Sequence, residues 1–197
     1  MFWLALGYPL LAHLGAVLGE AWLQWLALLW LLAISLSGAL LARHAWAWLT
    51  LSGSAIALYW LVIAGGGLYA LYVPPALIPA ALFIAFARSL RTDAQPLITR
   101  IATMMRGEPL PPPLVAYTRQ VTLLWCGVFV VMFASAVGLA IWATPKVWSV
   151  MTNFVHYLVL GAVFVLEFAY RRMRFRDLEP WGLFEYLRRL VRTNINA

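Results

Sequence analysis

Charged side chains are scarce in this sequence of 197 residues, at 11% of the total against 64% that are hydrophobic. Soluble globular domains carry about 25% charged residues and about 45–50% apolar ones. An apolar excess of this size is too large for one buried core, so it must extend along most of the chain. The shortage of charge therefore excludes an ordinary soluble domain and indicates a polytopic membrane protein.

Cysteine and acidic residues are also few. The single cysteine, Cys126, excludes an intrachain disulfide and a cysteine cluster for zinc. The chain has no G-x-S-x-G elbow, phosphate-binding loop or H-E-x-x-H motif. Only seven acids are present, too few for two-carboxylate or two-metal catalysis within a membrane. We therefore expect no catalytic residues, no metal and no cofactor, and an enzyme that relies on histidine alone is an alternative.

Six apolar segments make up most of the chain. An α-helix needs about 20 residues to cross a bilayer, and most breaks between these segments carry glycine, proline or charge. The expected spans are Phe2–Leu18, Trp22–Leu41, Trp46–Ala64, Leu68–Ala87, Val121–Trp142 and Val147–Tyr170. This pattern predicts an all-α fold of six transmembrane helices, in which short connections make neighbouring helices antiparallel.

The basic residues predict how these spans are oriented. Of the fourteen lysines and arginines, only Lys146 falls on the side opposite to the others when six spans are assumed. The positive-inside rule places the arginine-rich side in the cytoplasm. We therefore expect both termini on the cytoplasmic side of a bacterial inner membrane, with the N-terminal segment retained as the first helix. Trp142 and Trp148 lie near span ends and are expected in interfacial belts.

Composition divides the chain into four parts. These are a four-helix membrane half at 1–87, a cytoplasmic connector at 88–117, a two-helix membrane half at 118–172 and a basic tail at 173–197. Amphipathic cytoplasmic helices are expected at about 94–105, between the cap Asp93 and the stop Gly107, and at about 180–193. Their arginines are expected to contact anionic lipids of the inner leaflet or a partner: Arg100, Arg106, Arg188, Arg189 and Arg192.

Polar side chains within the predicted spans form a first candidate site. His13 lies in the outer half of the first span, and Asn153 and His156 share a face of the sixth. If both helices run straight, the three side chains lie at a similar depth. Ionisable groups at such depth are functional candidates by default. A polar site or proton path is one interpretation, and hydrogen bonds that join neighbouring helices are the other.

Glu167 is the one acid within the predicted spans. It precedes Arg171 by four residues, the favourable order for an ion pair along a helix. It also lies at about the depth of Arg119, where the antiparallel fifth span begins. We expect Glu167 to pair with one of these arginines and hold helices together, and a polar lumen along the sixth span is the alternative.

The second half of the chain carries a recognisable set of motifs: Tyr117-Thr118-Arg119, Trp125-Cys126, Trp148, Asn153 and the stretch from Glu167 to Arg172. In these motifs the chain resembles a family of bacterial inner-membrane proteins found with fatty-acid- and aryl-polyene-type biosynthetic genes. The resemblance covers roughly residues 93–172. It implies a cell-envelope setting and brings no catalytic residues.

A looser similarity is carried by Pro96-Leu97-Ile98-Thr99-Arg100, by Gly107-Glu108-Pro109-Leu110 and by Arg119 followed by Trp125. Here the chain is similar to the intracellular septation protein A family of the cell envelope. That similarity implies a role in septation or envelope maintenance, again without a reaction.

These observations favour a non-catalytic accessory or scaffold protein that supports envelope lipid or polyene-type acyl-chain biosynthesis. A basic cytoplasmic surface would attract acidic partners such as acyl carrier protein or acyl-handling enzymes. Nucleic-acid binding is not expected, because the arginines gather at the ends of apolar segments rather than on one face. The alternatives are a small transporter or lipid-handling protein that uses the intramembrane polar site, a membrane enzyme, and a septation protein.

Overall fold

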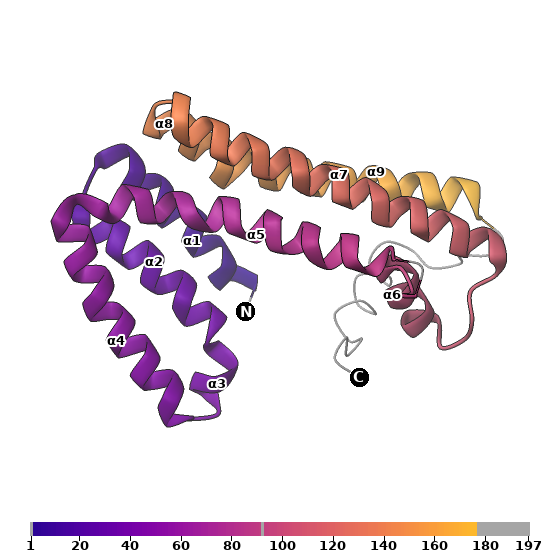
Figure 1. The fold of residues 1–197 in the computed structure, drawn as a ribbon, viewed down its shortest axis with the longest axis horizontal. Helices are drawn as coiled ribbons and strands as arrows, with labels where there is room; N and C mark the ends of the chain where they lie inside the picture. Colours follow the sequence, from indigo (N-terminus) through magenta and orange to yellow (C-terminus); the bar gives the residue numbers. More distant parts are fainter. Residues whose placement is uncertain (1, 92, 177–197) are drawn as a thin grey trace. The chain divides into compact units, whose positions relative to one another are not determined.

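The computed structural model describes residues 2–91 and 93–176, and every regular element in these ranges is helical (Figure 1). This confirms the all-helical fold. The elements are α1 (Phe2–Leu18), α2 (Ala21–Ser35), α3 (Ser37–Leu41), α4 (Ala45–Leu61), the π-helix η1 (Val62–Gly66), α5 (Gly67–Ser89), α6 (Leu97–Arg106), α7 (Pro112–Trp142), α8 (Pro145–Val150), the π-helix η2 (Met151–Val155) and α9 (His156–Arg174). The helix predicted at about 180–193, with Arg188, Arg189 and Arg192, lies outside the described residues.

Three helical stretches of the described chain are long and apolar enough to cross a membrane. They are Ala45–Ser89, Pro112–Trp142 and Pro145–Arg174. Two shorter apolar helices are Gly7–Leu18 and Ala21–Ser35. By length and composition, these helices identify the chain as a membrane protein.

The longest of these stretches is broken at Gly65. This residue has φ +84° and ψ 3°, in the left-handed region, inside η1. The chain changes direction here between α4 and α5 (Figure 1). Residues with a side chain adopt this backbone conformation at a cost, whereas glycine adopts it freely. The break predicted between the third and fourth apolar segments therefore lies at the residue type best suited to it.

The chain packs into two compact units whose boundaries fall inside α5, α7 and α9. Unit 1 holds the described residues up to Ile78 together with Phe133–Tyr157. Unit 2 holds Pro79–Met132 together with the described residues from Leu158 onward. Each unit thus combines segments that lie far apart in the sequence.

Trp148 lies in the core of unit 1. It belongs to α8, which contacts α1, and it has no exposed surface. Its ring packs on that of Tyr72, with centroids 4.5 Å apart, and Tyr8 and Leu71 belong to the same buried cluster. Trp148 is therefore a core residue of unit 1, because α8 turns its ring onto the N-terminal helices. Trp142, by contrast, is 84% exposed at the end of α7.

Helices α1 and α2 approach each other closely at Gly15. A Cβ atom at this position would lie 3.0 Å from the backbone nitrogen of Gln24. The Gln24 side chain uses this proximity, because its Nε2 donates to the Gly15 carbonyl at 3.1 Å. A buried amide is in this way bonded to a buried backbone group, as an apolar environment requires.

In unit 2, α6 packs against the start of α7. The hydroxyls of Thr99 and Thr118 are 2.7 Å apart and buried.

Gly107 ends α6 with φ +75°, as predicted. The predicted start at residue 94 is wrong: Pro96 disfavours the helical conformation of the residue before it, so α6 begins at Leu97. The Leu97 N–H donates to Ser89 Oγ at 2.9 Å, and no hydrogen bond from the predicted cap, Asp93, is part of this terminus.

Replacing Gly65 with alanine should lower the unfolding midpoint, because a left-handed backbone costs an L-residue about 1–2 kcal/mol. Gly53→Ala is the matched control: Gly53 lies inside α4 with open space around its Cα, and alanine favours a helix. Thermal unfolding in detergent can be followed with a thiol-reactive dye, since the single cysteine, Cys126, is buried in the fold. Equal midpoints for the two variants would contradict the strain assigned to Gly65.

Candidate functional site

The hydroxyl of Ser149 lies between two of the predicted site residues. Its Oγ is 3.0 Å from His13 Nδ1 and accepts a hydrogen bond from Asn153 Nδ2 at 2.9 Å. Ser149 and Asn153 are buried, and His13 is half-buried. The structure therefore brings His13 and Asn153 together through a serine, and it links α1 to α8 and η2.

His156 contacts a different serine. Its Nε2 is 2.9 Å from Ser135 Oγ on α7. Among the described residues, no hydrogen bond joins His156 to His13 or Asn153. The three residues expected at one level thus belong to two separate contacts: Asn153 reaches α1 through Ser149, and His156, at the start of α9, meets Ser135 on α7.

Neither Ser149 nor Ser135 was predicted from the sequence to be a site residue. Ser149 precedes Asn153 by four residues, a spacing that places both on one helix face, and this spacing is the signal that could have revealed it. Ser135 offers no comparable signal, since its partner lies 21 residues away on another helix. Hydroxyl pairs of this kind hold membrane helices together.

An open apolar groove of about 610 Å³ adjoins the contact between Ser135 and His156. It lies within unit 1 and is lined mainly by apolar side chains, among them Leu139, Trp142 and Met151. Met151 belongs to η2, and single π-turns within α-helices are frequent at functional sites. The groove is suited to an apolar chain, and a polar group lies at one side of it.

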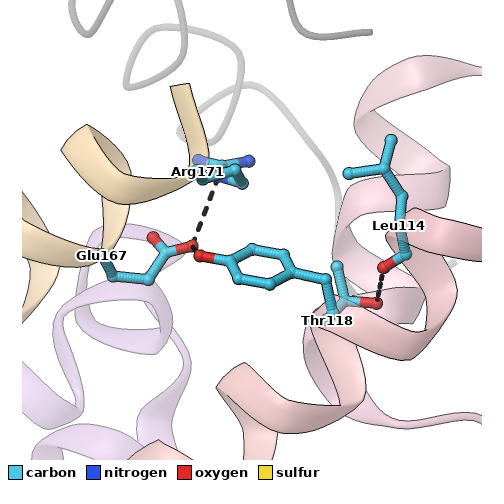
Figure 2. A network of polar contacts seen from close by, with 5 residues as sticks. Leu114, Thr118, Glu167 and Arg171 are labelled. Atoms are coloured by element: carbon cyan, nitrogen blue, oxygen red, sulfur yellow. Dashed lines mark hydrogen bonds and ion pairs between the residues drawn. The ribbon is translucent and has the colours of Figure 1, made fainter. Parts of the chain in front are cut away.

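Glu167 and Arg171 form a buried ion pair near the end of α9 (Figure 2). Glu167 Oε1 is 3.3 Å from Arg171 Nε, and the two side chains are 10% and 5% exposed. The hydroxyl of Tyr117 on α7 donates to the same carboxylate oxygen at 3.1 Å. Of the two arginines considered for Glu167, the structure therefore pairs it with Arg171, whereas Arg119 is exposed on α7 and pairs with no described acid.

Four helices of unit 2 begin or end in one region (Figure 1), and the arginines of the described part of unit 2 lie in or beside these helix ends. We call this the basic end: the close of α5, all of α6, the first turns of α7 and the close of α9. The described part of unit 2 holds nine arginines but only the acids Asp93, Glu108 and Glu167. The arginines are Arg88, Arg91, Arg100, Arg106, Arg119, Arg171, Arg172, Arg174 and Arg176.

The two predicted headgroup contacts in this region differ in their surroundings. Arg100 is exposed on α6. Arg106 is partly covered, and its Nε donates to Glu108 Oε1 at 2.7 Å. The two arginines thus differ in exposure, since Arg100 lies at the surface and Arg106 is partly covered.

No protein-family model, curated protein or solved structure matches the chain. The resemblances drawn from the motifs of the second half therefore stay predictions, and the function must be inferred from the geometry described above.

Replacing Glu167 with alanine should destabilise the fold by about 3 kcal/mol, because it removes the acid from a buried ion pair and leaves the arginine charge in place. Arg119→Ala should change the stability by less than about 0.5 kcal/mol, since Arg119 is exposed and outside the pair. Unfolding in detergent, reported by the reactivity of Cys126, would measure both. A larger loss for Arg119→Ala than for Glu167→Ala would show that the pairing is wrong.

Proposed function

We propose that this chain crosses a bacterial inner membrane six times, with both termini in the cytoplasm. The six spans would be α1, the stretch from α2 to α3, α4, α5, α7 and the stretch from α8 to α9. Gly65 divides the longest apolar stretch into two, and only Leu36 separates α2 from α3. This arrangement supports a cytoplasmic basic end, with Lys146 on the opposite side.

Within that membrane, the protein would act as a non-catalytic accessory or scaffold for envelope lipid or polyene-type acyl-chain biosynthesis. The observation that carries this proposal is the basic end, with nine arginines against three acids in the described part of unit 2. Such a surface attracts acidic partners by long-range electrostatics. Acyl carrier proteins are acidic, and the family resemblance to envelope acyl-chain systems points to the same class of partner.

The local structure of the basic end suits a recruiting role. The bond between Thr99 and Thr118 fixes α6 against α7, and the bond from Leu97 to Ser89 fixes its start to the end of α5. Exposed arginines are then presented on a rigid platform, among them Arg100. A rigid, charged surface loses little conformational freedom when a partner binds.

The proposed topology makes a direct prediction for cysteine labelling. In a Cys126→Ala background, Lys146→Cys should react with a membrane-impermeant maleimide on spheroplasts, because it would face the periplasm. Arg91→Cys, which is at an exposed position, should react only after permeabilisation. Labelling of Arg91→Cys on intact spheroplasts would overturn the orientation.

The proposed role predicts a charge-dependent partner. Crosslinking and mass spectrometry of the tagged protein from its native membrane should recover acyl carrier protein or an acyl-handling enzyme. Recovery should fall in Arg91→Gln/Arg100→Gln and at raised salt, because screening weakens contacts between exposed charges. Arg43→Gln, which removes a charge from unit 1, is the control.

Two results would contradict this role. One is recovery of the chain without any acyl-handling protein, which would favour transport or lipid handling instead. The other is a partner that binds equally well to the double variant and to the unchanged protein, since the basic end would then play no part.

A further inference from the structure

A second groove, of about 450 Å³, runs between α7 and α9 within unit 2. Each helix contributes four lining residues at the spacing i, i+3, i+4 and i+7, which is one face of an α-helix. The residues of α7 are Tyr117, Gln120, Val121 and Leu124, and those of α9 are Val163, Leu166, Glu167 and Tyr170. The groove therefore follows the seam of an antiparallel helix pair.

The lining changes from polar to apolar along this seam. The rings of Tyr117 and Tyr170 stack at one end, with centroids 6.0 Å apart. In antiparallel register, Gln120 is next to Glu167, followed by Val121 with Leu166 and then Leu124 with Val163. The polar half lies toward the basic end, and the apolar half extends away from it into the apolar part of both helices.

The charge in the polar half favours an anionic occupant. The carboxylate of Glu167 is held in its ion pair with Arg171 and accepts from Tyr117, so it does not act as an isolated negative charge. Arg174 follows the lining residue Tyr170 by four positions, on the same face of α9, and is exposed. The amide of Gln120 and the hydroxyl of Tyr170 form no hydrogen bond with another described residue, and both types of group can donate to phosphate oxygens.

We infer that this groove binds one anionic phospholipid, with an acyl chain against Val121, Leu124, Val163 and Leu166 and the phosphate at Gln120 and Tyr170. The arrangement matches a bilayer lipid, whose charged head lies at the membrane surface while its chains extend inward. The basic end supplies the attraction for the head, and the seam supplies apolar contact for the chain. This inference rests on the membrane class of the chain and is independent of the recruiting role proposed above.

Native mass spectrometry of the full-length protein in detergent, with added lipid, tests this site. Phosphatidylglycerol should be retained as one bound molecule, in preference to phosphatidylcholine with the same acyl chains. Leu124→Trp should weaken the retention of phosphatidylglycerol by about tenfold, because the indole occupies the space of the chain. Gln120→Ala should weaken the retention of both lipids, because both carry the phosphate that Gln120 contacts, whereas Arg174→Gln should reduce the preference for phosphatidylglycerol, because it removes a positive charge beside the headgroup.

The control for steric filling is Leu123→Trp. Leu123 is the same residue type at the adjacent position of α7 and is similarly exposed, at 53% against 48% for Leu124, but it does not line the groove. Its variant should retain phosphatidylglycerol as the unchanged protein does. The reactivity of Cys126 on heating establishes that each variant is folded.

Three results would overturn the inference. Equal loss of lipid in Leu123→Trp and Leu124→Trp would show that the groove is not the site. Equal retention of phosphatidylcholine and phosphatidylglycerol would show that no anionic headgroup is recognised. Full retention of phosphatidylglycerol by folded Leu124→Trp would show that the acyl chain lies elsewhere.

Discussion

The need to satisfy polar groups inside the protein shapes the helices of this structure and many of the contacts between them. In an apolar bilayer, water does not bond to backbone or side-chain groups, so helices must close their own hydrogen bonds. Hydroxyl side chains follow the same constraint here. Thr152 donates to the carbonyl of Trp148, and Thr122 donates to that of Thr118. Some polar side chains also bond to each other where two helices meet, as His13 and Asn153 do through Ser149.

The same constraint explains why so few charges lie in the described helices and how they are held. Glu167 and Arg171 are buried within one turn of each other, and Tyr117 adds a donor from a second helix. Arg171 also lies over the ring of Phe168, 5.6 Å from its centroid, which offers a further favourable contact. A buried pair of this kind adds little net stability compared with apolar residues, but removing one partner is costly. Both charges lie on α9, so the hydrogen bond from Tyr117 is what joins this pair to α7 in unit 2.

Charge also distinguishes the two units in what they can bind. In their described parts, unit 2 carries nine arginines and three acids, whereas unit 1 carries Arg43, Lys146 and Glu20. The proposed recruitment of an acidic partner and the inferred binding of an anionic lipid both rest on this excess in unit 2. The two proposed roles would use different surfaces: α6 presents exposed charge, and the seam of α7 and α9 presents apolar surface beside charge. Unit 1 offers a different chemistry, with hydroxyl and imidazole groups near an apolar groove.

Local sequence determined the helical class, the break at Gly65 and the end of α6 at Gly107, because hydropathy, glycine and proline act on their own neighbourhood. It also identified the polar side chains that lie within apolar helices. Only the tertiary structure decided their partners. Ser149 joins His13 to Asn153, Ser135 contacts His156, and Trp148 packs in the core of unit 1. Those outcomes depend on which helix faces meet across long stretches of chain, and a single serine or tryptophan in an apolar helix gives no local sign of the face that it will meet.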